Sequence, residues 1–209
     1  QQNFKALVIT VDSPHTGIRD RERRVFFQLP EGMQHPHTPT HIPLPEIAEN
    51  QHPVFNGLMQ IAPKWADIEW IIAHTSLSVI LKGIVHPQDA KLALQYGVQG
   101  LIISNHGGRV LDTCISPLTA LKLIKKVVPT DFPLILDGGI RRGSDVFKAI
   151  ALGAAAVCIG RPYIYGLATA GALGVAHVLK ILKEEFEITM ALMGTATVND
   201  INQEHILHK

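Results

Sequence analysis

The sequence contains little of what marks several large classes of protein. Its 209 residues include two cysteines, Cys114 and Cys158, which form neither a CxxC pair nor the spacing of a zinc site. Nineteen basic residues against 18 acidic ones leave a formal charge of +1. This balance does not indicate a surface for nucleic acid or for anionic membranes. We therefore expect a reduced compartment, no bound metal and no nucleic-acid partner.

Long apolar segments are also scarce. No run of about 18 consecutive apolar residues is present, and the first ten residues lack the basic start of a signal peptide. The sequence thus predicts no membrane span, and the cytoplasm is the expected location. Hydrophobic residues make up 46% of the chain, which is enough for one globular domain over residues 1–209. The chain enters an apolar, β-branched run within a few residues of Gln1, so we expect this domain to be incomplete on its N-terminal side.

Strand-like and helix-like segments alternate along the chain. Five continuous apolar runs are typical of strands buried on both faces of a parallel sheet. These runs are Ala6–Val11, Ser78–Lys82, Gly100–Ser104, Pro133–Asp137 and Ala155–Gly160. Helix start and stop signals predict helices over residues 86–97, 116–128 and 144–153, and helical spacing predicts a long final helix from Gly171 to Met193.

The segment from Glu31 to Lys64 interrupts this alternation. It is rich in proline and histidine, so it is predicted to be one long variable loop. A metal site at His35-x-His37 is the weaker alternative, because no acidic or cysteine partner stands at ligand spacing.

Alternating strands and helices imply right-handed parallel βαβ units, which leaves an open doubly wound sheet or a closed (β/α)₈ TIM barrel. Polar residues follow the carboxyl ends of the predicted strands, where barrel enzymes build their active sites. They are Thr10, Asp12, Lys82, Ser104, His106, Asp137, Gly160 and Arg161. We therefore predict an α/β fold of the barrel type, in which the five runs are strands four to eight and strands one to three are absent.

Two of these strand ends carry glycine-rich loops. The loop Asp137-Gly138-Gly139-Ile140-Arg141 precedes a predicted helix, so its amides and the helix dipole could hold a phosphate. The loop Gly160-Arg161-Pro162 adds a guanidinium that can bind phosphate through paired donors. Either loop alone is common after a strand, but the two together indicate a phosphate site.

A third strand end carries groups suited to acid-base chemistry. His106 is a natural general base, and Arg109 can hold a carboxylate. Asp12, at another strand end, could orient the imidazole and stabilise its protonated form. Lys82 ends the strand between them, where a buried ammonium needs an anion.

Five motifs together resemble one enzyme family. They are Thr10-Val11-Asp12-Ser13-Pro14, Lys82-Gly83-Ile84, Ser104-Asn105-His106-Gly107-Gly108-Arg109, Asp137-Gly138-Gly139-Ile140-Arg141-Arg142-Gly143 and Gly160-Arg161-Pro162. In their order and their position at strand ends they resemble the FMN-dependent 2-hydroxy acid oxidases and dehydrogenases, which include glycolate oxidase and lactate oxidase. The resemblance implies an FMN cofactor, a small-molecule L-2-hydroxy acid substrate that is oxidised to the 2-oxo acid, and possible assembly as a homotetramer.

The resemblance also implies a role for each matching residue. His106 would be the base, Asp12 would support it, and Arg19 and Arg109 would bind the substrate carboxylate. Lys82 would lie against the flavin and stabilise its reduced form. The other implied flavin contacts are Thr10, Ser104 and Asp137, with Gly138, Gly139, Ile140, Arg141, Gly160 and Arg161 around the phosphate.

The sequence departs from the family pattern at two kinds of place. Ile18 and Val25 replace usual basic and amide residues around Arg19, which is itself kept. The first three strands, with further flavin and substrate contacts, are not in the sequence. Two alternatives therefore stay open. One is another phosphate-binding barrel, such as a flavin-dependent isomerase or an IMP dehydrogenase-like protein, which would leave His106 and Arg109 without a role. The other is a truncated, inactive fragment that at most binds FMN or a partner chain.

Overall fold

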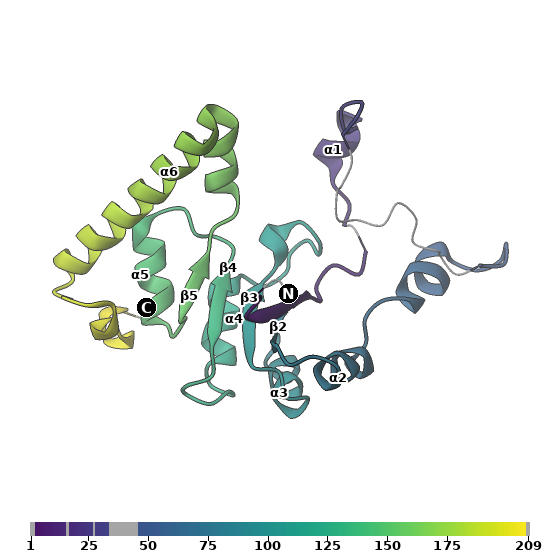
Figure 1. The fold of residues 1–209 in the computed structure, drawn as a ribbon, viewed down its shortest axis with the longest axis horizontal. Helices are drawn as coiled ribbons and strands as arrows, with labels where there is room; N and C mark the ends of the chain where they lie inside the picture. Colours follow the sequence, from purple (N-terminus) through teal and green to yellow (C-terminus); the bar gives the residue numbers. More distant parts are fainter. Residues whose placement is uncertain (1–2, 16, 27, 34–45, 208–209) are drawn as a thin grey trace.

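A computed structural model describes residues 3–15, 17–26, 28–33 and 46–207. Its centre is a five-stranded parallel sheet in the order β1-β2-β3-β4-β5, so each strand pairs with its sequence neighbours (Figure 1). The strands are β1 (Ala6–Thr10), β2 (Ser78–Lys82), β3 (Gly100–Ser104), β4 (Leu134–Asp137) and β5 (Ala156–Cys158). All five predicted strands are therefore present, with ends that agree within two residues. This sheet of consecutive parallel strands is the part of a TIM barrel that the sequence predicts.

Helices connect the strands and cover one face of the sheet. They are α1 (Asp20–Arg24), α2 (Trp65–Ala73), α3 (Pro87–Gln95), α4 (Pro117–Ile124), α5 (Gly143–Ala151) and α6 (Arg161–Leu192). In Figure 1, α2 and α3 lie below the sheet, α5 lies between β5 and α6, and α1 stands apart from the other helices. The helices α3, α4 and α5 follow the sequence prediction, although α4 ends at Ile124 rather than near Val128.

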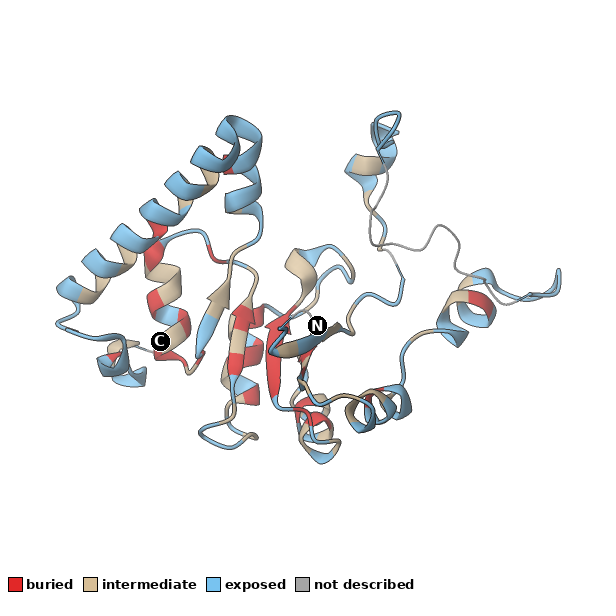
Figure 2. Ribbon diagram, in the orientation of Figure 1, coloured by how far each residue is buried: buried red, intermediate tan, exposed pale blue. Residues whose placement is uncertain are grey.

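The core lies between the sheet and its helices, because alternate side chains of a strand point to opposite faces. Leu81, Leu101 and Leu136 are fully buried and belong to one cluster with buried residues of α3, α4 and α5. Figure 2 shows buried segments in the centre of the sheet and in the helices beside it. On the opposite face, Ile80 and Ile135 are half-buried, and Val8 is 46% exposed. One face of the sheet is therefore covered, and the other is partly open.

Helix α6 differs from the expected single helix that starts at Gly171. It begins ten residues earlier, at Arg161, and is broken at Ala170 and Gly171, where the backbone leaves the helical region. The two halves fold back on each other, since a Cβ placed on Gly166 would lie 2.6 Å from the carbonyl oxygen of Gly174. Only glycine permits such a close approach of two backbones.

The composition of α6 also bears on the expectation of no membrane span. By length and composition this helix is apolar enough to cross a membrane, and its most apolar stretch is little buried within the described structure. Every 18-residue stretch of α6 that has no more than two charged residues includes Ala170 and Gly171. The apolar stretch is therefore bent back at its centre and does not form one straight helix.

Two further helices were absent from the sequence prediction. They are α1 and α2, and the second begins directly after the predicted loop. Within the described part of that loop, residues 53–57 form a π-helical turn and residues 58–60 a 3₁₀ turn. His35 and His37 lie outside the described residues, and within the described residues no group of three or more metal-ligating side chains comes together.

Candidate active site

The carboxyl ends of three adjacent strands bring three polar side chains into contact. Ser104 ends β3 and pairs in register with Asp137, which ends β4, while Lys82 ends β2. The Lys82 Nζ lies 3.1 Å from Asp137 Oδ2 and 3.2 Å from Ser104 Oγ. The ammonium that sequence analysis expected to need an anion therefore has one, from the neighbouring strand end.

The hydroxyl of Ser104 is fully occupied by protein groups. It donates to Asp137 Oδ2 at 2.7 Å and accepts from Lys82 Nζ and from the His106 amide at 3.0 Å. A hydroxyl has one donor and two acceptor positions, so this buried group has none left. In this arrangement Ser104 aligns Lys82, Asp137 and the start of the His106 loop, and it could bond a flavin only by giving up one of these partners.

His106 is held by Asp12, which follows β1. The two side chains meet at 3.1 Å between His106 Nδ1 and Asp12 Oδ1. When Asp12 accepts this hydrogen bond, Nδ1 is the donor, and in the neutral imidazole the lone pair then lies on Nε2. Asp12 Oδ2 is buried and has no hydrogen-bond partner among the described residues.

Backbone geometry fixes this pair. Gly83 follows β2 at φ +112°, and a Cβ placed on it would lie 2.5 Å from Asp12 Cβ, so only glycine lets Asp12 approach this strand end. His106 has a φ of +55°, in the left-handed region, and Gly107 and Gly108 continue the same conformation. Such strain in a residue other than glycine is characteristic of functional loops.

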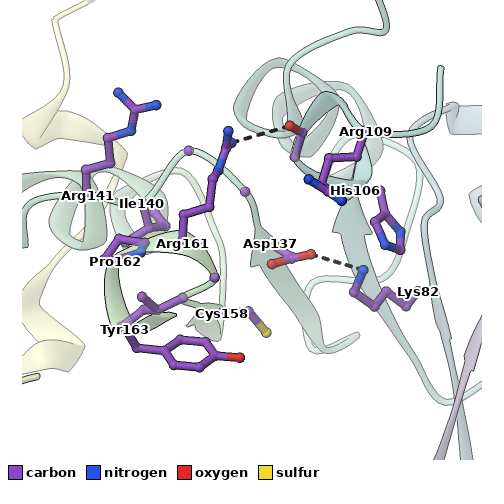
Figure 3. A pocket seen from close by; sticks show the side chains of 15 residues that line it. Lys82, His106, Arg109, Asp137, Ile140, Arg141, Cys158, Arg161, Pro162 and Tyr163 are labelled. Atoms are coloured by element: carbon purple, nitrogen blue, oxygen red, sulfur yellow. Dashed lines mark hydrogen bonds and ion pairs between the residues drawn. The ribbon is translucent and has the colours of Figure 1, made fainter. Parts of the chain in front are cut away.

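A cleft of about 400 Å³ opens beside these residues (Figure 3). Its lining includes most of the predicted site residues: Lys82, His106, Arg109, Asp137, Gly138, Gly139, Ile140, Arg141, Gly160 and Arg161. Thr10, Asp12, Arg19 and Ser104 lie outside the lining. Asp12 contacts His106, and Ser104 contacts Lys82, so both are one residue away from the lining. Thr10 ends β1 and is paired in register with Lys82 of β2.

The two glycine loops face open space in this cleft. A Cβ placed on Gly139 or Gly160 would meet no protein atom within 4 Å. Among the described residues, no hydrogen bond from the amides of Gly139 and Ile140 to a protein acceptor is observed. The Arg141 amide, in contrast, already donates to Asp145 Oδ2 at 3.1 Å. An anion in this cleft would therefore find free donors at residues 139–140.

Arg161 connects the second glycine loop with the His106 loop. Its Nη2 donates to the carbonyl oxygen of Gly107 at 3.3 Å, and Figure 3 shows its side chain reaching toward that turn while Arg141 points away from it. The described lining thus has one carboxylate, that of Asp137, against four cations: Lys82, Arg109, Arg141 and Arg161. This excess of positive charge suits a phosphate or carboxylate.

The two arginines expected to bind a carboxylate already share one. Glu22 of α1 bonds Arg109 Nη2 at 2.9 Å through Oε1 and Arg19 Nη1 at 3.1 Å through Oε2. Hydrogen bonds from Arg19 and then Arg109 lower the pKa of Glu22 below its ordinary value. Sequence analysis did not predict this contact, because Glu22 and Arg109 are 87 residues apart.

Sequence reasoning also missed Cys158 and Tyr163, which line the same cleft. Cys158 ends β5 and is paired in register with Asp137, so its position at a strand end was the available signal. Burial, and then the nearby Asp137 carboxylate, raise the pKa of the Cys158 thiol.

The fold and the site together define an α/β barrel segment in which a histidine-carboxylate pair lies near two open glycine-rich loops. The sequence profile of the FMN-dependent dehydrogenase family matches residues 1–208, and the chain belongs to this family. It is 46% identical over 205 residues to an L-lactate oxidase of Roseobacter sp. (strain GAI101), covering 95% of this chain and 54% of the relative. It is 46% identical over 203 residues to a 2-hydroxyacid oxidase of Dictyostelium discoideum, covering 97% and 52%.

Solved structures agree with these matches. A mandelate oxidase crystallised with 3,3-difluoro-2-hydroxy-3-phenylpropionic acid is 37% identical with a TM-score of 0.78, and the match covers 96% of this chain and 54% of that one. The chain therefore spans about half the length of the relatives it matches, and the TIM-barrel fold predicted from the strand ends is confirmed.

Family membership indicates FMN as the cofactor, and the residues present fit it. The open glycine loops with Arg161 match a phosphate, and the cleft volume lies in the range of small-molecule sites.

Proposed function

We propose that this chain supplies the base, the carboxylate-binding arginines and the phosphate loops of an FMN-dependent enzyme that oxidises an L-2-hydroxy acid to the 2-oxo acid. The observation that carries the proposal is the His106–Asp12 pair, whose imidazole lines the same cleft as Arg109 and both glycine loops. The other phosphate-binding barrels considered from the sequence would leave His106 and Arg109 without a role.

Oxidation of a 2-hydroxy acid removes two electrons and two protons from the carbon-oxygen unit at C2. FMN, when bound, would accept the two electrons together with one of the two protons. His106 accepts a proton at Nε2, because Nδ1 already donates to Asp12. The imidazole becomes positively charged in this step, and the Asp12 carboxylate, 3.1 Å away, stabilises that charge.

The remaining side chains bind and orient. Arg109 and Arg19 hold the substrate carboxylate, which fixes C2 relative to the imidazole. Lys82 places a positive charge beside the flavin, and Asp137 with Ser104 sets the position of that charge. Gly138, Gly139, Ile140, Gly160 and Arg161 hold the phosphate, and we assign Thr10 to the flavin as well.

The names of the relatives suggest which substrates to test. Relatives named L-lactate oxidase and glycolate oxidase make lactate and glycolate the first acids to test. We also propose that the protein lies in the cytoplasm and assembles as a homotetramer.

The test is an absorption spectrum of the purified protein, followed by anaerobic addition of L-lactate or glycolate. We expect bound flavin whose visible absorption band bleaches with one of these acids. The variant His106→Gln should keep the flavin and lose turnover by roughly 10²–10⁴-fold, the usual contribution of a general base. A protein that binds no flavin, or that binds flavin which no hydroxy acid reduces, would instead support the inactive fragment.

A further inference from the structure

Glu22 occupies the place where the substrate carboxylate is proposed to bind. Arg19 precedes α1 and Arg109 ends the His106 loop, yet both guanidiniums contact the same carboxylate, at 3.1 and 2.9 Å. One carboxylate between two arginines reproduces the charge and the bonding pattern of a bound 2-hydroxy acid.

The contact is supported by the backbone around it. A Cβ placed on Gly17 would lie 2.2 Å from the carbonyl oxygen of Val110 and 2.9 Å from that of Arg109. The chain leading into α1 therefore packs directly on the backbone of the His106 loop. This close packing, which only glycine allows, keeps Glu22 within reach of Arg109.

We propose that Glu22 is an internal competitor for the substrate carboxylate, which must displace it from Arg19 and Arg109 in order to bind. This inference rests on the proposed function, because it requires the two arginines to be the carboxylate site. Glu22 thereby lowers the affinity for 2-hydroxy acids, whereas a neutral analogue that does not replace Glu22 at the arginines is unaffected.

The surroundings of Glu22 permit the exchange. The Glu22 and Arg109 side chains are 43% and 48% exposed, and ion pairs at such positions are weak and readily broken. Glu22 also lines a second cavity of about 580 Å³, together with Arg23, which can receive the displaced side chain. Arg19 Nε is buried and lacks a partner among the described residues, so the guanidinium has a donor beyond those that Glu22 uses.

The opposite role would be a positioning residue that holds the two arginines ready for the substrate. The two roles predict opposite signs when the charge is removed. Loss of a competitor strengthens carboxylate binding, whereas loss of a positioning residue weakens it. An increase in affinity also separates the proposal from structural damage, which lowers affinity.

The experiment is calorimetric titration of the FMN-loaded protein with pyruvate, a 2-oxo acid that undergoes no further oxidation here. We expect Glu22→Gln to bind pyruvate about tenfold more tightly than the parent, a change equal to about 1.4 kcal/mol. Glu22→Asp, which is too short to span both arginines, should show a smaller gain. Asp20→Asn, which removes the same charge from the same helix, should leave the affinity within about twofold. Pyruvamide, which lacks the charge, should bind the parent and Glu22→Gln equally.

Arg109→Met separates this inference from the proposed function. If Arg109→Met weakens pyruvate binding while Glu22→Gln leaves it unchanged or weakens it, the competitor role is wrong and the carboxylate site stands. If Arg109→Met has no effect, the carboxylate site itself is wrong, and the role of Glu22 is wrong with it. Should Glu22→Gln fail to fold, Glu22→Asp decides by the same sign.

Discussion

His106 contacts one oxygen of Asp12, which lies 3.1 Å from its Nδ1. Asp12→Asn keeps an oxygen that can accept from Nδ1 but removes the negative charge. We expect hydroxy acid turnover to fall by roughly 10²–10⁴-fold while the FMN content stays unchanged. Asp131→Asn, at an exposed loop position, is the matched control. Turnover within about threefold of the parent would show that the carboxylate charge has no part in the reaction.

Cys158 provides a second prediction at the residue scale. Burial and the Asp137 carboxylate both disfavour its thiolate, so its pKa is raised above the ordinary 9.0. Because the thiolate is the reactive form, alkylation by iodoacetamide at pH 7 should be slower than for free cysteine, and the rate should still rise above pH 9. FMN should slow it further, because Cys158 lines the cleft. Peptide mapping of the alkylated chain measures this, and a rate at pH 7 equal to that of free cysteine would contradict it.

At the scale of elements, the N-terminus of α5 is capped by a residue of α6. Glu185 accepts from the Gly143 amide at 2.8 Å and pairs with Arg142 at 2.8 Å. Glu185→Ala should therefore lower the free energy of unfolding by about 1–2 kcal/mol, as loss of a helix cap does. The neighbouring Glu184 makes only an exposed pair with Lys180, so Glu184→Ala should cost less than about 0.5 kcal/mol. Urea unfolding compares the two variants, and equal losses would exclude the cap.

The elements that sequence analysis found and missed differ in how they begin. The helix α4 starts after Ser116, whose side chain caps it, and so carries a local signal. The helices α2 and α6 start after Lys64 and Gly160, and neither residue makes a capping hydrogen bond with its own side chain. Sequence analysis placed no helix start at either residue, although Pro162 in the first turn of α6 is a local start signal.

The site shows the same division between local and distant information. The strand-end residues Lys82, Ser104 and Asp137 were predicted because each follows a continuous apolar run. The contact of Glu22 with Arg109 joins segments far apart in the chain and exists only once the fold has formed. Sequence patterns predict which residues reach the site, and the fold determines which of them pair.

At the scale of the whole molecule, the open sheet face and the edge strand β1 should promote self-association. Val8 lies on this edge and is 46% exposed. Unpaired apolar edge strands are templates for association, so sedimentation velocity should show assemblies that grow with protein concentration. Val8→Thr, which keeps the shape but adds a hydroxyl, should reduce them. Val198→Thr, at a position 47% exposed and away from the sheet, should not. Equal effects of the two variants would contradict a role for β1.

The alternation of side chains along the strands limits which changes in chain length this site can tolerate. Lys82 and Asp137 reach the cleft because each lies two residues after an isoleucine on the partly open face of the sheet. These isoleucines are Ile80 in β2 and Ile135 in β4. Insertion of a single residue within β2 would turn Leu81 toward the cleft in place of the ammonium. Insertion of two residues would restore the correct face, and insertions in the loops would leave it unchanged. Among natural variants of this domain, gains and losses of residues inside strands should therefore come in pairs.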